Sequence, residues 1–204
     1  MRTRRQSPIV LIAALLLIPF MALRLCSRSR LPVHRPAQSI FTQLPGDAPV
    51  SLTLSSTAFS NGGSIPERYT CNSADLSPAL TWSAAPARTQ SLALIVDDPD
   101  APTGSWTHWL LWNIPARATL LSEDVPKVET LDNGARQGIN DFQQIGYGGP
   151  CPSPGKPHRY FFKLYALDAR LDLKPGTNKS ELERAIAPHM LAQSHIMGTY
   201  GRSS

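Results

Sequence analysis

The feature that most constrains the fold is a succession of short apolar stretches separated by connections rich in proline and glycine. Apolar runs and period-two alternation predict strands in six stretches: 50–56, 77–82, 91–96, 105–114, 158–168 and 194–202. Residues 177–187 form the one clear helix pattern, with Thr177 or Asn178 as its cap and Pro188 bending or ending it. The sequence therefore predicts a mainly β fold, an antiparallel Greek-key-like β-sandwich with one or two short C-terminal helices.

The N-terminal part of the chain differs in composition from the rest. Residues 1–26 join a basic start to 15 uncharged residues, Ile9 to Leu23, which predicts a signal peptide or an N-terminal membrane anchor. Residues 27–48 mix arginine, proline and serine and are predicted to be a flexible linker. Residues 49–204 are expected to form one β-sandwich domain. We therefore expect a protein that is exported (periplasmic or secreted) or anchored to a membrane only through its N-terminal segment.

The positive charge of the chain is confined to this N-terminal part. The formal net charge is +5, yet seven arginines and one acidic residue precede Pro49. From Pro49 onward, 13 basic residues are matched by 14 acidic ones. A nearly neutral domain has no basic stripe for a phosphodiester backbone, so no nucleic-acid partner is expected.

Two of the three cysteines, Cys71 and Cys151, lie in the predicted domain, and Cys26 lies before it. In an oxidising compartment Cys71 and Cys151 could form a disulfide, whereas in a reducing one they would be two small core residues. The sequence leaves both interpretations open.

Polar residues gather at the ends of the predicted strands. Asp98 and Asp100 follow the strand at 91–96, and nearby prolines, among them Pro102, stiffen the backbone around them. Alternate residues of a strand share a face. One face is therefore expected to carry Trp106, His108, Leu110 and Trp112, and another His158, Tyr160, Phe162 and Leu164. Each face begins with a polar and aromatic pair and continues as core, which predicts a pocket at one end of the sandwich.

A third component of the predicted pocket is the segment GYGGPCPSPGKP at 146–157, whose glycines allow backbone N–H groups to approach an anion. Taken singly, the aspartates could cap turns and each histidine could be a structurally bonded one. Their joint position at strand ends favours a binding site. Two histidines and two carboxylates lack metal-binding spacing, and no G-x-S-x-G nucleophile is present, so we expect no metal, cofactor or catalytic residue.

These motifs resemble the phosphatidylethanolamine-binding protein (PEBP) family, in its bacterial branch of Raf-kinase-inhibitor-like proteins. The resemblance covers residues 50–202 and rests on blocks that occur in the family's order: SIPERYTCN, SPALTW, DDPDAPTGSWTHWLLWNIP, GINDF, GYGGPCPSPGKPHRYFFKLYALD and GTYGR. The chain departs from the branch's usual pattern at Ser153 and Pro157, and both changes could tighten the loop.

The resemblance implies a small β-sandwich with an anion pocket at one end and no general enzymatic activity. Together with the strand ends it suggests these ligand-binding residues: Asp98, Asp100, Pro102, Trp106, His108, Gly149, Pro150, Pro152, His158 and Tyr160. Family members bind phosphate-bearing groups such as phospholipid head groups or nucleotides, and some modulate kinases or inhibit proteases. We therefore expect a non-enzymatic phosphate-binding protein. The alternatives are a kinase- or protease-inhibiting module and, less favoured, an acid–base enzyme that uses Asp98 and His108.

The charges of this predicted pocket suggest how it works. Nearby carboxylates are expected to raise the pKa of His108 and His158, because a negative charge favours an imidazolium. A partly cationic histidine pair would then attract phosphate, and Asp98 would select ligands that carry a hydrogen-bond donor.

Overall fold

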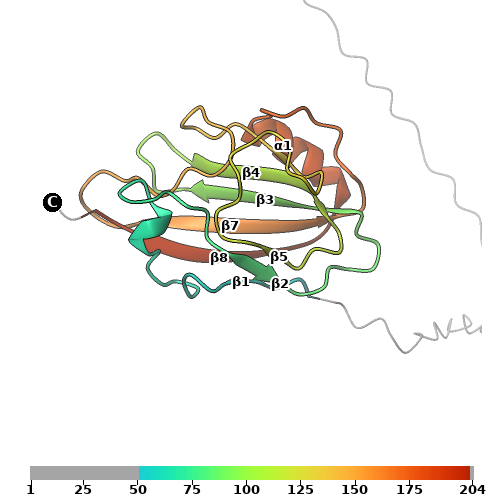
Figure 1. Cartoon of the computed structure of the whole chain (residues 1–204), viewed down its shortest axis with the longest axis horizontal. Coiled ribbons are helices and arrows are strands. Elements are labelled where there is room, and N and C mark those ends of the chain that lie inside the picture. Colours follow the sequence, from blue (N-terminus) through green and yellow to red (C-terminus); the bar gives the residue numbers. More distant parts are fainter. Residues whose placement is uncertain (1–50, 203–204) are drawn as a thin grey trace, which may run out of the picture. The chain divides into compact units, whose positions relative to one another are not determined.

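The computed structural model describes residues 51–202, which fold into two antiparallel sheets and one α-helix (Figure 1). The smaller sheet has the order β1-β2-β5, with β1 at Leu54–Ser56, β2 at Leu80–Trp82 and β5 at Leu120–Leu121. The larger sheet has the order β6-β4-β3-β7-β8, with bounds Arg136–Gln137, Trp106–Pro115, Ser91–Asp98, His158–Leu167 and Met190–Tyr200. The signal peptide or anchor predicted at 1–26 and the linker at 27–48 lie outside the described residues, so both stay predictions.

The strand order of the larger sheet follows a Greek-key pattern. Strands β3, β4 and β6 lie in sequence order across the sheet, and β7 returns through a long connection to pair with the free side of β3. This arrangement confirms the predicted mainly β, antiparallel class. Within residues 51–202, no helix has the length and apolar character needed to cross a membrane.

Helix α1, Lys179–Ile186, lies where the sequence predicts it, and Asn178 is its cap. The Asn178 side chain accepts from the Glu181 amide at 3.0 Å, and the Glu181 carboxylate accepts from the Asn178 amide at 3.2 Å. This reciprocal pair satisfies two amide groups that would otherwise lack partners. Pro188 lies in a short 3-10 turn, Ala187–His189, and strand β8 begins directly after it.

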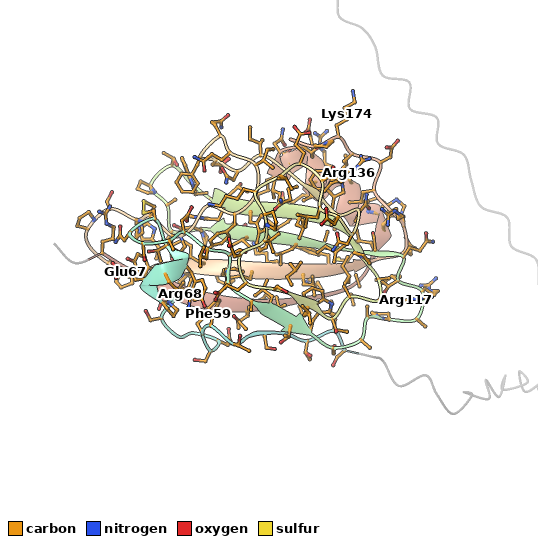
Figure 2. All side chains as sticks on the ribbon, in the orientation of Figure 1. Phe59, Glu67, Arg68, Arg117, Arg136 and Lys174 are labelled. Carbon is orange, nitrogen blue, oxygen red and sulfur yellow. A yellow bond between two sulfur atoms is a disulfide. The ribbon has the colours of Figure 1, made fainter. Side chains whose placement is uncertain are left out.

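Two clusters of buried side chains lie on opposite faces of the larger sheet. The cluster between the two sheets includes Leu80, Leu94 and Phe162, whereas the cluster that includes Ile95 and Leu182 packs beneath α1. Strand β3 is buried along its whole length, because each of its faces is covered. Charged side chains such as those of Lys174 and Arg117 project at the margin of the molecule (Figure 2).

A β-bulge in β4 changes the face on which its side chains lie. Val96 pairs with Trp109 and Asp97 pairs with Thr107, so His108 is an extra residue between two successive pairs. The predicted face of β4 is therefore wrong, because the alternation changes phase at His108. Leu110 and Trp112 pack beneath α1, whereas the His108 ring lies 5.1 Å from the ring of Tyr160, a member of the cluster between the sheets.

The predicted face of β7 is confirmed. Tyr160, Phe162 and Leu164 are all buried in the cluster between the sheets, and His158 begins the strand at the edge of that cluster. Three strand ends consequently meet at one end of the sandwich: the end of β3 at Asp98, the start of β4 at Trp106 and the start of β7 at His158.

Candidate ligand pocket

A cavity of about 210 Å³ opens where these three strand ends meet. Its lining comes from the ends of the three strands, from the turn between β3 and β4, and from the connection between β6 and β7. The lining residues are Asp98, Ala101, Pro102, Thr103, Trp106, His108, Phe142, Cys151, Pro152, Ser153 and His158. Apolar and aromatic groups make up most of its wall, and a few polar groups converge on it.

Six of the ten predicted ligand-binding residues line this cavity: Asp98, Pro102, Trp106, His108, Pro152 and His158. The other four, Asp100, Gly149, Pro150 and Tyr160, do not line it. Each of those four has another partner or lies deeper in the core, as described below.

Asp98 and His158 form a fixed pair at the polar end of the cavity. Asp98 is 3 % exposed, and its Oδ2 lies 2.8 Å from His158 Nδ1. Its Oδ1 accepts a hydrogen bond from the Asp100 amide at 2.8 Å. Because both carboxylate oxygens have partners, Asp98 is held in place and in turn holds the His158 ring, leaving His158 Nε2 as the ring's other polar atom.

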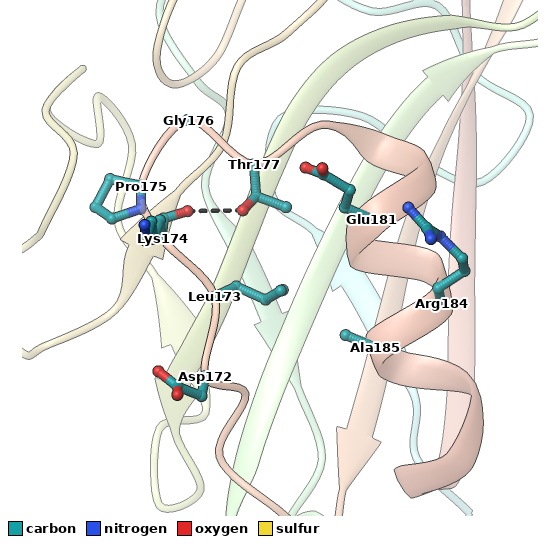
Figure 3. A pocket seen from close by; sticks show the side chains of 9 residues that line it. All are labelled: Asp172, Leu173, Lys174, Pro175, Gly176, Thr177, Glu181, Arg184 and Ala185. Carbon is teal, nitrogen blue, oxygen red and sulfur yellow. Dashed lines mark hydrogen bonds between the residues drawn. The ribbon is translucent and has the colours of Figure 1, made fainter.

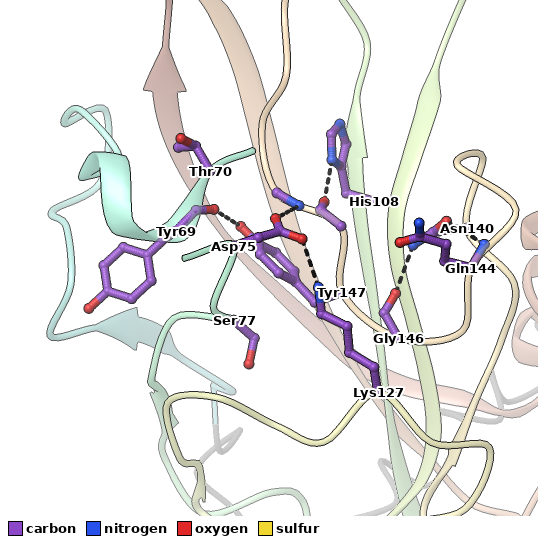
Figure 4. Close-up of polar contacts among 12 residues, drawn as sticks. Tyr69, Thr70, Asp75, Ser77, His108, Lys127, Asn140, Gln144, Gly146 and Tyr147 are labelled. Carbon is purple, nitrogen blue, oxygen red and sulfur yellow. Dashed lines mark hydrogen bonds and ion pairs between the residues drawn. The ribbon is translucent and has the colours of Figure 1, made fainter. Parts of the chain in front are cut away.

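His108 is 2 % exposed and is held by the backbone of the neighbouring segment. Its Nδ1 lies 2.6 Å from the Gly148 carbonyl oxygen (Figure 4). The Gly148 amide donates to the His108 carbonyl at 2.9 Å. A carbonyl oxygen can only accept, so the hydrogen of this bond belongs to His108 Nδ1.

The expected rise in the pKa of His108 is wrong. Burial lowers the pKa of this imidazole, because desolvation disfavours its charged form. The carboxylates of Asp98 and Asp141 act in the opposite direction, but their effect is smaller than that of burial. His108 is therefore a neutral hydrogen-bonding group and not a cation that attracts phosphate.

Asp100 turns away from the cavity and pairs with Arg159 at the surface. The Arg159 guanidinium donates to both carboxylate oxygens, at 2.7 and 2.8 Å, and the Arg159 amide donates to Oδ2 at 3.0 Å. These hydrogen bonds lower the pKa of Asp100 to about 2. Asp100 lines a separate outer hollow together with residues 153–158, which include Lys156. This hollow shares Ser153 and His158 with the cavity.

The amides of Gly148 and Gly149, two of the backbone donors expected from the glycine-rich segment, already have partners in the protein. The Gly149 amide donates to Asp75 Oδ1 at 2.6 Å, and Lys127 Nζ donates to the other oxygen of the same carboxylate at 2.7 Å (Figure 4). The Pro150 carbonyl accepts from the Cys71 amide at 3.2 Å. These contacts bind the segment to the chain around residues 70–76, and they are structural rather than ligand-directed.

Cys71 and Cys151 are joined by a disulfide, with their Cα atoms 5.4 Å apart. Of the two possibilities that the sequence leaves open, the structure contains the paired one. Because Cys151 itself lines the cavity, the disulfide fixes one wall of the pocket to a segment 80 residues earlier in the chain.

Tyr160 lies behind the pocket rather than in its wall. It is 1 % exposed, and its hydroxyl has no hydrogen-bond partner among the described residues. Burial raises the pKa of this phenol, so Tyr160 stays neutral. Its ring packs edge-to-face with that of His108, with the centroids 5.1 Å apart, and restricts the position of that imidazole.

The sequence reasoning missed Phe142, which forms an aromatic wall of the pocket. Its ring centroid lies 5.4 Å from those of both Trp106 and His108. The signal available in the sequence was an aromatic residue between polar neighbours, Asp141 and Gln143, in the connection between β6 and β7. Asp75 was missed as well, because a carboxylate between turns gives no indication of a partner 74 residues away.

A larger hollow of about 600 Å³ lies beside α1, but it lacks the features of a binding site. It is an open surface depression between residues 172–177 and the helix (Figure 3). Its charged side chains are exposed and of both signs: Asp172, Lys174, Glu181 and Arg184. Over residues 51–202, no group of three or more histidine, cysteine or acidic side chains is arranged to hold a metal ion.

Comparison with known proteins gives a consistent family. The sequence profile of the phosphatidylethanolamine-binding protein family matches residues 55–201. A UPF0098 protein of Methanothermobacter thermautotrophicus is 48 % identical over 151 residues, which are 74 % of this chain and 99 % of that protein. Another UPF0098 protein, from Aquifex aeolicus, is 48 % identical over 149 residues, 72 % of this chain and 86 % of its own.

Two crystal structures share the fold. One is a putative PEBP homologue, CT736 of Chlamydia trachomatis, with a TM-score of 0.69, 39 % identity, and coverage of 75 % of this chain and 99 % of that one. The other is YBCL of E. coli, described as a new member of the mammalian PEBP family, with a TM-score of 0.71, 33 % identity and the same coverage. The predicted resemblance is thus confirmed, and the chain belongs to the phosphatidylethanolamine-binding protein family.

Proposed function

We propose that this protein is a non-enzymatic binding protein for small phosphate-bearing ligands. The observation that carries the proposal is the convergence of Asp98, His108 and His158 on one cavity with mainly apolar walls. A concave, mostly apolar site with a few polar groups aimed at one point is typical of small-molecule binding sites. Family membership supports a binding role for the fold.

The size of the cavity favours a head group over a larger ligand. Pockets for drug-sized ligands usually have volumes of about 300–1,000 Å³, whereas this cavity has about 210 Å³. A phosphate group with a short substituent suits this volume, and the rest of a nucleotide or lipid would remain outside it. The outer hollow that contains Lys156 adjoins the cavity and offers space for such a substituent.

The side chains of the pocket support binding rather than bond cleavage. A nucleophilic hydrolase needs a serine or cysteine that is activated by a base within hydrogen-bonding reach. Cys151 is bonded to Cys71, and within the described residues Ser153 makes no hydrogen bond to His108 or His158. The Asp98–His158 pair is therefore assigned to positioning a ligand oxygen.

Isothermal titration calorimetry with phosphoethanolamine tests this proposal. His158→Ala removes the side chain that Asp98 holds against the cavity, so its dissociation constant should rise at least tenfold. His189→Ala is the matched control, because His189 makes a similar contact with Asp168, at 3.0 Å, on the surface. Equal affinity in the wild type and a folded His158→Ala variant, or no binding by the wild type, would contradict the proposal.

A further inference from the structure

The contacts of the two pocket histidines assign different hydrogen-bonding roles to them. Asp98 accepts at His158 Nδ1, so His158 Nε2 can donate to a ligand whenever that ring is an imidazolium. Gly148 accepts at His108 Nδ1. In a neutral imidazole the second nitrogen then has no hydrogen, so His108 Nε2 carries a lone pair and is an acceptor.

The surroundings of His108 keep it in this neutral form. The groups that face it are Asp98 from β3, Asp141 from the connection after β6, and His158 and Tyr160 from β7. The two carboxylates favour a charged ring, but burial at 2 % exposure outweighs them. The hydrogen bond to Gly148 uses His108 Nδ1 and the ring lines the cavity, so Nε2 is the nitrogen that a ligand there can reach.

The charge of the cavity also disfavours a doubly charged ligand. Its lining contains the Asp98 carboxylate and neither lysine nor arginine, and Lys156 belongs to the adjoining hollow. A phosphate dianion has only acceptor oxygens, so it could offer nothing to the His108 lone pair and would be repelled by Asp98. A phosphate that keeps one proton has a lower charge and provides the missing donor.

We propose that His108 makes the pocket selective for the singly protonated form of a phosphomonoester, whose P–O–H group donates to His108 Nε2. The other phosphate oxygens lie towards His158, whose ring Asp98 holds against the cavity. This inference rests on the proposed function and names the ligand form that the pocket takes. A sulfate monoester has the same tetrahedral shape but carries no proton near neutral pH, and a phosphodiester likewise lacks the P–O–H group.

Calorimetry with three probes between pH 5.5 and 8 tests the inference on the full chain: methyl phosphate, methyl sulfate and glycerophosphoethanolamine. At pH 5.5, methyl sulfate should bind at least tenfold more weakly than methyl phosphate. Above the second pKa of a phosphomonoester, about 6, the affinity for methyl phosphate should fall towards tenfold per pH unit. Protonation of groups on the protein changes the affinities for methyl phosphate and methyl sulfate by the same factor. The ratio of the two affinities therefore reports only the effect of the proton on the phosphate.

A His108→Gln variant sharpens the test, because its amide can donate as well as accept. In this variant the preference for methyl phosphate over methyl sulfate at pH 5.5 should fall from at least tenfold to less than threefold. The wild-type ratio decides the question even if the variant does not fold.

Three wild-type outcomes would overturn the inference, and they are distinguishable. If the dissociation constant for methyl sulfate lay within twofold of that for methyl phosphate, the pocket would not recognise a proton on the ligand. Equally tight, pH-independent binding of glycerophosphoethanolamine would show that a lipid-type head group supplies the donor through its ammonium group. No binding of any probe would overturn the proposed function itself, and this inference with it.

Discussion

Asp97 and Asp98 are neighbours at the end of β3, and they are buried to a similar degree on opposite faces of the sheet. Asp97, 2 % exposed, is held by Lys163 at 2.8 Å and by Lys179 at the start of α1. Asp98, 3 % exposed, has one imidazole partner and an open cavity beside it. Burial of a carboxylate therefore does not identify a functional site. A buried carboxylate that holds an imidazole against an open cavity does.

The two regions also differ in how they are held together. The Asp97 region lies on regular elements, since its partners come from β7 and α1. One wall of the Asp98 pocket comes from the irregular segment 146–157, which is fixed by the disulfide and by Asp75. Stability and binding should consequently respond to different substitutions in the two regions.

The largest expected effect comes from the disulfide on the pocket side. Replacing both Cys71 and Cys151 by serine opens a loop that spans 80 residues of sequence. Loop-closure entropy predicts a loss of about 4.5 kcal/mol in the free energy of unfolding. Urea denaturation without reductant measures this loss, and wild-type protein in excess dithiothreitol should match the variant. A loss below about 1 kcal/mol would contradict this account of the pocket wall.

The contrast between the two aspartates predicts opposite effects of their substitution: one should mainly lower stability, and the other should mainly lower ligand affinity. Asp97→Asn leaves two ammonium groups without their carboxylate, so the free energy of unfolding should fall by about 3 kcal/mol. The phosphoethanolamine affinity of the folded variant should stay unchanged, because Asp97 faces away from the cavity. Asp98→Asn should weaken that affinity at least tenfold and should lower stability less than Asp97→Asn. Calorimetry and urea denaturation of both variants measure the four values, and a reversed pattern would refute the comparison.

A smaller effect concerns His108 and the pH dependence of stability. Because burial lowers its pKa in the folded protein, the unfolded chain binds a proton below about pH 6.5 that the folded chain resists. The contribution of His108 to stability is thus fully present above that pH. It falls by at most about 1.4 kcal/mol per pH unit as the pH drops towards the folded pKa.

Urea denaturation at pH 5 and pH 7 tests this sign. The loss of stability between pH 7 and pH 5 should be smaller in His108→Gln than in the wild type. An unchanged pH dependence in His108→Gln would mean that burial does not suppress protonation of this ring.

The strands and the helix could be predicted because their signals are local. The apolar run at 91–96, the alternation of Tyr160, Phe162 and Leu164, and the cap at Asn178 are each set by neighbouring residues. Four pocket residues, Asp98, Trp106, His108 and His158, could be placed near strand ends for the same reason, whereas Pro102 and Pro152 followed from the motif resemblance. A period of two tells which side chains share a face only while the strand remains regular.

The bulge at His108 broke that regularity, and the sequence contains no clear signal for it. A bulge depends on how two strands pair, which is a property of the sheet and not of one strand. Two other residues also have partners outside the cavity: the Asp100 carboxylate accepts a hydrogen bond from Arg159, and the Gly149 amide donates one to Asp75. Both Asp100 and Gly149 were expected in the pocket, because the sequence shows which groups can form hydrogen bonds. It does not show which distant residue the fold places beside each group.

By itself, the sequence determined the β class, the positions of the main strands, the family and the convergence of polar residues at one end of the sandwich. The strands could be placed because hydrophobic periodicity and turn chemistry act over a few residues, and the family followed from the resemblance of its motifs. Only the tertiary structure decided which carboxylate faces the cavity and which nitrogen of His108 is free for a ligand. Those outcomes depend on burial and on contacts between distant segments, and burial reversed the direction in which the nearby charges would shift the pKa of His108.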